Sequence, residues 1–365
     1  MRIAVVNLVS VDGGGLSVLE DLHAFAGQHD EHEWLFVLGP QDLPALPHVR
    51  IARIPGAKSG PWGRLRAEMR DVPAAIDAFT PDVTLSLQNS RVRGRAGRQW
   101  VYLHQPLPFQ DAYRFSVLRP GELDSALRQH VQGRFIKSSL RRADGVFVQT
   151  RWMQEAARSA LGGTVPVELA GFPAPRPPSR PPVASTRLPS TFFYPAGPAI
   201  YKNFDRLHLA VRSLATQHPQ FTVQLTVTEE EFRRLARVPE GDDLTPYDFL
   251  GRVSPERVDE LYADSVLVFP SFIETLGLPL LEARVRGRFV IASDCAFARE
   301  VMAGYPDVVH VDPFDPQAWV EAMRRVLSGE QVVSGAPAPP LRVGGSWGAG
   351  LGALGNDGRG GEQGE

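Results

Sequence analysis

The chain has 365 residues and a mass of 40.1 kDa, a length that predicts two domains rather than a single core. Hydrophobic residues make up 43% of the sequence and charged residues 22%, with a net charge of −2, which are the proportions of an ordinary globular protein. One cysteine excludes a disulfide framework or a cysteine-rich metal site, and no apolar run approaches the roughly 20 residues of a membrane-spanning helix.

The amino-terminal sequence MRIAVVNLVSVDGGG lacks the long apolar segment and the small-residue cleavage site of a secretory signal. It is typical of a first β-strand that leads into a glycine-rich turn. Together with the single cysteine, this predicts a cytoplasmic protein.

Short apolar runs alternate with segments of helical periodicity through residues 1–172, the expected first domain. Strands are predicted at residues 2–9, 34–38, 49–54, 83–87, 99–103 and 145–149. Helices are predicted at residues 16–27, 63–79 and 123–142, and through residue 161 after Thr150 as the N-cap. Continuous apolar strands such as IAVVNLV are typical of a parallel sheet that is buried on both faces, so a Rossmann-like α/β domain is expected.

A proline-rich linker and a second α/β series follow. Residues 173–190 hold seven prolines, which exclude a regular helix or strand there. Strands are then predicted at residues 191–194, 221–227, 249–250, 265–269, 289–292 and 308–311, and helices at residues 203–217, 255–263, 278–287 and 316–329. A second doubly wound Rossmann-like domain is thus expected over residues 191–334, with a cleft between the two domains. Residues 335–365 contain 11 glycines and predict a disordered tail.

The segment FPSFIETLGLPLLEA (269–283) is the most informative for chemistry. It follows a predicted buried strand and opens a helix, with Pro279 in the first turn. The backbone amides of Leu276, Gly277 and Leu278 are expected to point out of the helix start, an arrangement that suits a phosphate group. The carboxylates of Glu274 and Glu282 are expected on either side, where they can accept hydrogen bonds from sugar hydroxyls. A capped helix with an ordinary glutamate is the alternative.

The pattern E-x7-E from Glu274 to Glu282, with LGLPLLEA between, closely resembles the signature of the family 4 retaining glycosyltransferases of the GT-B fold. The resemblance extends over residues 190–328. It implies that Glu274 contacts hydroxyls of the donor sugar, that Glu282 holds the nucleotide ribose, and that the 276–278 amides hold the donor diphosphate. It also implies a metal-independent retaining transfer from a nucleotide-diphosphate sugar, with mannose or rhamnose favoured, to a glycan or lipid-linked acceptor. No cofactor is expected beyond the substrate itself.

Further positions in the second half match the resembled family. Lys202 in FFYPAGPAIYKNF corresponds to the lysine that binds donor phosphate, and its ammonium suits the charge of a departing diphosphate. Ala196 stands where many members have an arginine, and Arg252 is a candidate replacement. Gly251, Arg252 and Val253 match the loop that usually borders the nucleobase.

Two features of the first half are expected to face the donor. Gly14 and Gly15 lie in the glycine-rich turn after the first strand, near donor phosphate and acceptor in the resembled family. His104 ends a predicted strand, where family members have a histidine that touches the donor sugar; a buried structural histidine is the alternative. As a dinucleotide fingerprint the turn is poor, because Val18 occupies the third glycine position, which disfavours a NAD-dependent dehydrogenase.

Positive charge is concentrated between residues 50 and 142, where 17 Lys and Arg stand against 7 Asp and Glu. The segment is either an ordinary solvated surface or attracts an anionic acceptor or the inner face of the cell membrane. No metal site is expected, because His, Asp and Glu show no ligand spacing. No nucleic-acid partner is expected either.

A catalytically silent protein that binds a nucleotide sugar or a partner is the main alternative. Ala196 at the usual arginine position favours it, and so does the glycine-rich tail, which stands where this fold commonly has a last helix.

Overall fold

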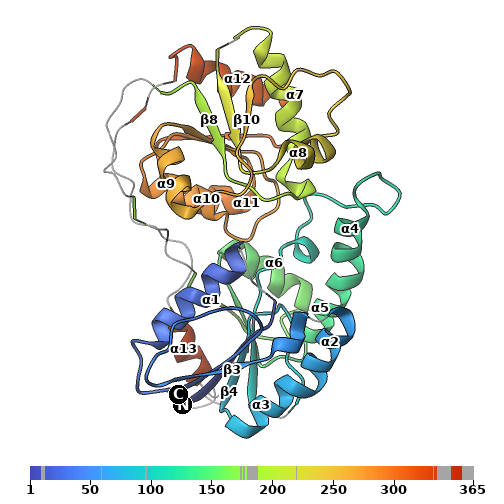
Figure 1. Cartoon of the computed structure of the whole chain (residues 1–365), viewed down its shortest axis with the longest axis vertical. Helices are drawn as coiled ribbons and strands as arrows, with labels where there is room; N and C mark the ends of the chain where they lie inside the picture. Colours follow the sequence, from blue (N-terminus) through green and yellow to red (C-terminus); the bar gives the residue numbers. More distant parts are fainter. Residues whose placement is uncertain are drawn as a thin grey trace, which may run out of the picture. The chain divides into compact units, whose positions relative to one another are not determined.

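The computed structural model describes residues 1–9, 13–58, 60–94, 97–172, 175, 177–178, 188–218, 220–331, 333–334 and 347–355. The chain divides into two compact units, each built around its own parallel sheet (Figure 1). The first unit comprises Met1–Phe109, Arg128–Ala174 and Val343–Glu365, and the second comprises Gln110–Leu127 and Pro175–Arg342.

The sheet of the first unit has seven strands in the order β3-β2-β1-β4-β5-β6-β7, and every neighbouring pair is parallel. The strands are β1 (Arg2–Asn7), β2 (Glu33–Leu38), β3 (Val49–Arg53), β4 (Val83–Ser86), β5 (Arg98–Tyr102), β6 (Gly145–Val148) and β7 (Val167–Leu169). Both faces of the central strands are covered, because Val5 and Val6, which point to opposite sides of β1, are fully buried in different clusters.

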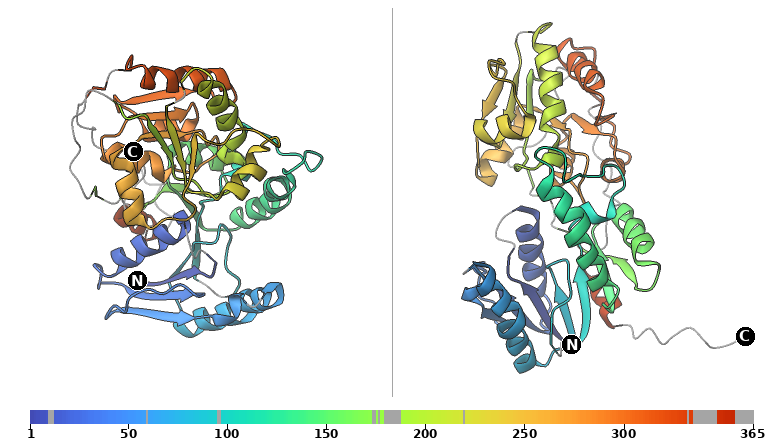
Figure 2. Two further views of the ribbon diagram at one scale, coloured as in Figure 1. Left: turned by 45° about the horizontal axis from the view of Figure 1, so that its top comes forward. Right: turned by 90° about the vertical axis from the view of Figure 1, so that its right-hand side faces the viewer.

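Helices of the first unit lie on both faces of its sheet (Figure 2). They are α1 (Gly13–Ala26), α2 (Gly60–Arg66), α3 (Val72–Phe79), α5 (Gly133–Leu140), α6 (Arg151–Leu161) and α13 (Trp347–Gly355). Shorter segments are η1 (Pro55–Lys58), η3 (Leu107–Phe109) and two π-helical turns, η2 (Ala67–Asp71) and η4 (Leu127–Gln132).

The sheet of the second unit has six parallel strands in the order β10-β9-β8-β11-β12-β13. The strands are β8 (Thr191–Tyr194), β9 (Thr222–Leu225), β10 (Tyr247–Phe249), β11 (Val266–Phe269), β12 (Val290–Ser293) and β13 (Val308–Val311). The helices are α4 (Leu123–Ala126), η5 (Ile200–Lys202), α7 (Phe204–Ala215), α8 (Glu229–Ala236), α9 (Pro255–Ala263), α10 (Leu278–Val285), α11 (Ala296–Val301) and α12 (Pro316–Leu327). Large aromatic side chains such as Phe193, Tyr262 and Trp319 are fully buried in this unit.

Residues 110–127 belong to the second unit although they lie early in the chain. The rings of Tyr113 and Phe115 pack on Phe272, with centroids 5.5 and 6.5 Å apart, and Tyr113 also faces Phe314 at 6.2 Å. This apolar contact fixes the segment to the second sheet domain, whereas the sequence placed it within a first domain of residues 1–172.

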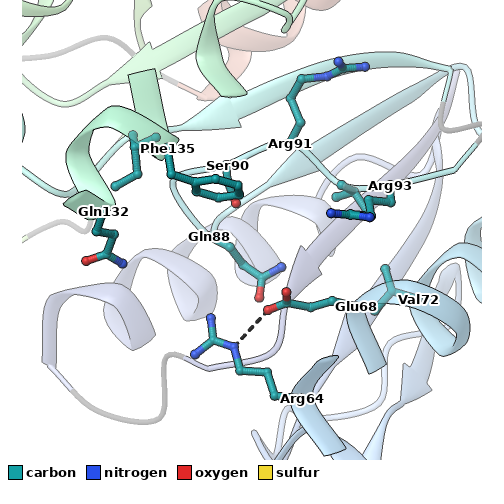
Figure 3. Close-up of a pocket in the computed structure, with 11 residues that line it drawn as sticks. Arg64, Glu68, Val72, Gln88, Ser90, Arg91, Arg93, Gln132 and Phe135 are labelled. Atoms are coloured by element: carbon teal, nitrogen blue, oxygen red, sulfur yellow. Dashed lines mark hydrogen bonds and ion pairs between the residues drawn. The ribbon is translucent and has the colours of Figure 1, made fainter. Parts of the chain in front are cut away.

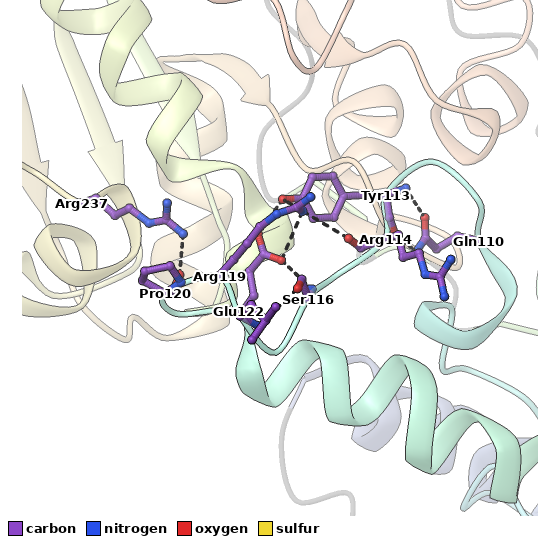
Figure 4. A network of polar contacts seen from close by, with 9 residues as sticks. Gln110, Tyr113, Arg114, Ser116, Arg119, Pro120, Glu122 and Arg237 are labelled. Carbon is purple, nitrogen blue, oxygen red and sulfur yellow. Dashed lines mark hydrogen bonds and ion pairs between the residues drawn. The ribbon is translucent and has the colours of Figure 1, made fainter.

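A polar network secures the same segment (Figure 4). The buried carboxylate of Glu122 accepts hydrogen bonds from the Tyr113 hydroxyl at 2.6 Å and from the Ser116 amide at 2.8 Å. Arg237 donates to the Pro120 carbonyl at 2.6 Å. These bonds satisfy a carboxylate that is only 3% exposed and that is costly to bury without partners.

The predicted α/β class and two Rossmann-like sheets are confirmed, with several local corrections. β7, α8 and α11 were not predicted, because they span only three to eight residues, too few for a clear apolar pattern. α8 instead begins at a capping box. The Thr228 side chain accepts a hydrogen bond from the Glu231 backbone amide, and the Glu231 side chain accepts one from the Thr228 backbone amide. The single helices predicted at residues 63–79 and 123–142 are each interrupted by a π-helical turn, η2 or η4.

The expectation of a disordered tail over residues 335–365 is wrong for part of that range. Trp347–Gly355 forms α13, and the Trp347 side chain is buried in the core of the first unit. Its indole donates to Asp21 Oδ2 at 2.7 Å, and its ring lies 5.5 Å from that of Tyr102. The rest of the expected tail, and most of the expected linker 173–190, lie outside the described residues.

Candidate functional site

In the second sheet the strand order reverses between β8 and β11, which are parallel neighbours in space but not in sequence. Open α/β sheets bind ligands at the carboxyl ends of the strands at this point. Lys202 follows β8 in η5, and Glu274 follows β11 in the loop before α10. The topology therefore places these two predicted residues at the expected position for a ligand.

Lys202 and Glu274 form an ion pair between Nζ and Oε1. The Ser271 hydroxyl donates to the same Oε1 at 2.7 Å. The two charged side chains are only 16% and 18% exposed, so the pair is largely removed from water yet still reachable. Sequence analysis predicted both charged residues but not the contact between them.

The charge state of Lys202 follows from its surroundings. Burial acts to lower the pKa of the ammonium, but the adjacent Glu274 carboxylate and the Tyr201 hydroxyl together outweigh burial, so the pKa is raised. Lys202 is therefore a fixed cation at neutral pH. Burial, together with the Glu274 charge, also raises the pKa of the Tyr194 hydroxyl well above its usual value.

Backbone and amide contacts hold the strand-end loops together. Asn203 has φ 64°, a left-handed conformation that asparagine tolerates, and its side-chain amide donates to the carbonyls of Pro270 at 3.1 Å and Pro313 at 2.6 Å. The Phe272 amide donates to the Tyr201 carbonyl at 3.1 Å. Three loops, after β8, β11 and β13, are thus fixed beside the Lys202–Glu274 pair.

Helix α10 begins directly after Glu274. Gly277 is its N-cap with φ 76°, and Leu276 and Gly277 are buried while Leu278 is half-buried. A side chain at Gly277 would approach Leu280 Cδ1 to 3.2 Å in an already left-handed conformation, which explains glycine there. The first amides of a helix lack intrahelical acceptors and carry partial positive charge, so this helix start suits an anion.

Glu282 lies in the second turn of α10, half-buried. The Tyr262 hydroxyl is 3.1 Å from both Glu282 Oε2 and the Pro279 carbonyl. Burial, and then the Glu282 charge, raises the pKa of Tyr262 well above its usual value, so Tyr262 remains a neutral donor. This contact orients the Glu282 carboxylate and was not predicted.

The remaining predicted donor residues of this unit lie at neighbouring strand ends. Gly251, with φ 62°, follows β10, and Arg252 and Val253 continue the loop to α9. Ala196 follows β8, where its amide and carbonyl both bond the Thr226 hydroxyl at 2.8 and 3.2 Å. The structure brings Lys202 and Glu274 into contact.

His104 follows β5 at the carboxyl edge of the first sheet. Asn89 Oδ1 accepts from the His104 amide at 2.7 Å, so Asn89 Nδ2 faces His104 Nε2 at 3.1 Å. Because Nε2 accepts, the ring proton belongs on Nδ1, which is buried and has no hydrogen-bond partner within the described part of the chain. Burial lowers the pKa of His104 to about 4, so the ring is neutral at pH 7. A buried donor without a partner is a candidate ligand contact.

Gly14 and Gly15 lie in the first turn of α1, with Gly14 exposed and Gly15 half-buried. They begin a helix at the carboxyl edge of the first sheet, as expected for a glycine-rich turn. The residues before them, 10–12, lie outside the described residues. The roles expected for His104, Gly14 and Gly15 stay predictions.

Sequence analysis missed Ser271, Asn203, Tyr262 and Asn89, which orient the charged or ring groups of the site. Ser271 and Asn203 each lie within three residues of a predicted site residue, and this proximity was the one available signal. In the described ranges, no group of three or more His, Cys, Asp or Glu side chains could hold a metal ion. Across the same residues, no helix has the length and hydropathy to cross a bilayer.

Comparison with known proteins agrees with this geometry. Residues 189–334, which contain the Lys202–Glu274 pair and α10, match the family model described as "Glycosyl transferases group 1". A segment of 83 residues is 35% identical to a curated "D-inositol 3-phosphate glycosyltransferase" of Corynebacterium urealyticum. That segment covers 22% of this chain and only 20% of the relative.

Solved structures resemble the whole chain. A sucrose-phosphate synthase of Thermosynechococcus elongatus superposes with a TM-score of 0.66 at 20% identity, over 92% of this chain and 91% of that one. WaaG, "a glycosyltransferase involved in lipopolysaccharide biosynthesis", gives a TM-score of 0.64 at 16% identity, over 90% of both chains. At such identities the likeness concerns the fold. The chain has the GT-B fold.

Proposed function

We propose that the protein is a retaining glycosyltransferase that moves a sugar from a nucleotide-diphosphate donor to a hydroxyl of a glycan or lipid-linked acceptor. The observation that carries the proposal is the Lys202–Glu274 pair beside the start of α10, at the strand junction where this fold binds ligands. The family match over residues 189–334 supports it. Mannose or rhamnose is the proposed sugar, and this choice rests on sequence resemblance alone.

Each residue has a chemical task in this proposal. The 276–278 amides and Lys202 bind the donor diphosphate, Glu282 binds the ribose, and Glu274 binds sugar hydroxyls. The bond between the anomeric carbon and the diphosphate oxygen breaks, and the diphosphate keeps the electron pair. The acceptor oxygen bonds the same face of that carbon, and its proton passes to a leaving phosphate oxygen. Lys202 stabilises the charge that develops on the diphosphate. No metal ion takes part in this proposal.

The acceptor side of the proposal includes peripheral attachment to an anionic membrane. In the first unit, Trp62 on α2 is 82% exposed and Phe135 on α5 is 61% exposed. Arginines lie near these apolar side chains on the same helices, Arg64 and Arg66 on α2 and Arg134 on α5, as in protein surfaces that bind the membrane interface. Sedimentation with vesicles that contain phosphatidylserine, but not with phosphatidylcholine alone, is the expected result; Trp62→Ser weakens it.

Turnover of purified variants tests the enzymatic proposal. Lys202→Ala and Glu282→Ala are expected to lower transfer at least about a hundredfold, because each removes a charged contact to the donor. Glu240→Ala, an exposed glutamate outside the site, serves as the matched control and retains activity. Wild-type turnover in either site variant would overturn the assignment, and thermal unfolding checks that both remain folded.

A catalytically silent nucleotide-sugar-binding protein is the second candidate. Ala196 favours it, because an alanine held on Thr226 supplies no cation where related enzymes often have arginine. Nucleotide-sugar binding by calorimetry without any donor hydrolysis or transfer would favour this reading.

A further inference from the structure

A cavity opens in the first unit where β4 ends (Figure 3). In this sheet the strand order reverses between β1 and β4, which are parallel neighbours in space. Gln88, two residues beyond β4, lines the cavity, and its Oε1 is 3.4 Å from the Leu8 amide just beyond β1. The cavity therefore occupies the ligand-binding position of the first sheet, as the Lys202–Glu274 pair does in the second.

Two walls of the cavity are π-helical. Glu68 lies in η2 and Gln132 lies in η4, and these are the two π-helical segments of the described residues. Well under 1% of residues in proteins adopt this conformation, and it is found frequently at functional sites. Here both π-helical segments line one cavity, from opposite sides. This arrangement distinguishes the cavity from an incidental depression of the surface.

The lining is rich in arginine. Arg64, Arg91 and Arg93 line the cavity together with a single carboxylate, Glu68. Arg64 is paired with Glu68 at 2.9 Å, and among the described residues no carboxylate pairs with Arg91 or Arg93. Figure 3 shows the Arg93 guanidinium and the Gln88 amide on the side of the Arg64–Glu68 pair, whereas the Arg91 guanidinium points away from Gln88. Arg93 is thus a planar donor without a counter-charge.

The size of the cavity limits what enters it. Its volume is about 150 Å³. Sites for whole drug-sized molecules measure about 300–1,000 Å³. The cavity suits one compact charged group with the remainder of the ligand outside. A phosphate group fits the planar, bidentate donors that arginine presents.

The edge of the cavity is apolar and open. Phe135, which lines it, is 61% exposed. A ligand with a phosphate inside and an apolar portion outside matches both parts.

We propose that this cavity binds a phosphate group of the sugar acceptor, with Arg93 as the principal charged contact and Gln88 as a neutral one. The assignment of this phosphate to the acceptor rests on the proposed glycosyltransferase function. The anion site itself is inferred from the cavity and its lining residues and does not depend on that function.

Calorimetry with inorganic phosphate tests the site in the full chain. A Lys202→Ala background removes the cation of the proposed donor site, so that the remaining binding reports the cavity. Arg93→Gln is expected to weaken binding roughly tenfold or more, because it removes a charge-assisted hydrogen bond. Arg93→Lys is expected to bind phosphate more tightly than Arg93→Gln but less tightly than arginine, since lysine keeps the positive charge but lacks the paired N–H donors of the planar guanidinium.

Arg70→Gln is the matched control. Arg70 is an exposed arginine of η2 that does not line the cavity, and its replacement should leave phosphate affinity unchanged within about twofold. Equal phosphate affinity with and without Arg93→Gln in the Lys202→Ala background, or no phosphate binding at all, overturns the proposal. Far-UV circular dichroism confirms that the exposed substitutions leave the fold intact.

Vesicles distinguish a lipid phosphate from a soluble one. If the source is a lipid, binding to phosphatidylcholine vesicles that contain phosphatidic acid falls in Arg93→Gln more than in Arg70→Gln, and inorganic phosphate competes. If both variants lose the same vesicle affinity while phosphate binding still depends on Arg93, the acceptor is a soluble phosphorylated compound.

Kinetics separates this inference from the proposed function. Arg93→Gln is expected to raise the KM for the acceptor with little change in kcat or in the KM for the donor. Arg93-dependent phosphate binding without any sugar transfer would leave the site standing and remove the enzymatic proposal. Transfer that is insensitive to Arg93, with no phosphate binding, would do the reverse.

Discussion

Lys202 and Glu274 neutralise each other in the structure, although the proposed function assigns each of them to a different part of the donor. A diphosphate carries more negative charge than one carboxylate, so it competes with Glu274 for the Lys202 ammonium. Once Lys202 turns to phosphate, Glu274 keeps the Ser271 hydrogen bond and can accept from a sugar hydroxyl. The pair therefore keeps both charges compensated before the donor arrives, which stabilises a site that is only partly open to water.

His104 gives a prediction about pH at the residue scale. Its pKa is lowered by burial from 6.5 to about 4, so below pH 6.5 the unfolded chain binds a proton that the folded chain does not. The free energy of unfolding of the first unit therefore falls as the pH decreases from 7 toward 5. In His104→Gln, which keeps an acceptor for Asn89 but cannot titrate there, the decrease is expected to be shallower.

Urea unfolding at several pH values measures this difference. Tryptophan fluorescence follows the first unit well, because it holds five of the six tryptophans, all except Trp319. Parallel curves for the wild-type and His104→Gln proteins between pH 7 and 5 would show that the ring is not held neutral by the fold.

At the scale of elements, the sequence predicts well the strands that are buried in a sheet. It predicts poorly the elements whose conformation is set by packing against distant parts of the chain. Apolar runs predict twelve of the strands, and most clearly central ones such as β1 and β11, because a strand buried on both faces has to be apolar. β7 was missed because it is a three-residue edge strand with a glutamate at its centre and only its first residue fully buried. The π-helical turns are invisible to periodicity, since one additional residue in a turn is set by tertiary packing.

The same distinction explains the site. Glu274 and Glu282 were found from their spacing around a helix start, which is local information. The contacts that orient them, from Ser271 and Tyr262, arise from the way strands and helices meet and leave no sequence pattern of their own. Residues 110–127 are a similar case, because the rings that attach Tyr113 to the second unit, Phe272 and Phe314, come from distant parts of the chain.

Helix α13 gives a prediction at this scale. The helix is made largely of glycine, alanine and leucine, so its own propensity is weak, and it is held by the buried side chain of Trp347. Trp347→Ala is expected to lower the free energy of unfolding of the first unit by about 3–5 kcal/mol, the usual cost of removing a buried aromatic side chain.

Asp21→Asn is the matched control, because the amide oxygen still accepts from the indole of Trp347. It should cost about 1 kcal/mol or less. Urea unfolding gives both values. If Trp347→Ala unfolds at the wild-type midpoint, α13 does not contribute to the core of the first unit.

At the scale of the whole molecule, two units with separate sheets and separate buried cores are expected to unfold in separate steps. The charged residues of the proposed donor site, Lys202, Glu274 and Glu282, all belong to the second unit. A nucleoside diphosphate should therefore stabilise the second unit directly. At a ligand concentration one hundred times Kd, the stabilisation is about 2.7 kcal/mol.

Trp319 makes this measurable, because it is the one tryptophan in the second unit and its side chain is fully buried. Thermal unfolding is followed by fluorescence in the wild-type protein and in Trp319→Phe, and the difference between the curves reports the second unit. Nucleoside diphosphate should shift the unfolding transition seen in this difference curve, which belongs to the second unit, to higher temperature. The unfolding transition of the first unit, which remains in Trp319→Phe, should shift less. The shift should vanish in Lys202→Ala, because without the ammonium the diphosphate loses its charged partner. A ligand effect confined to the transition of the five other tryptophans would place nucleotide binding in the first unit and refute the proposed donor site.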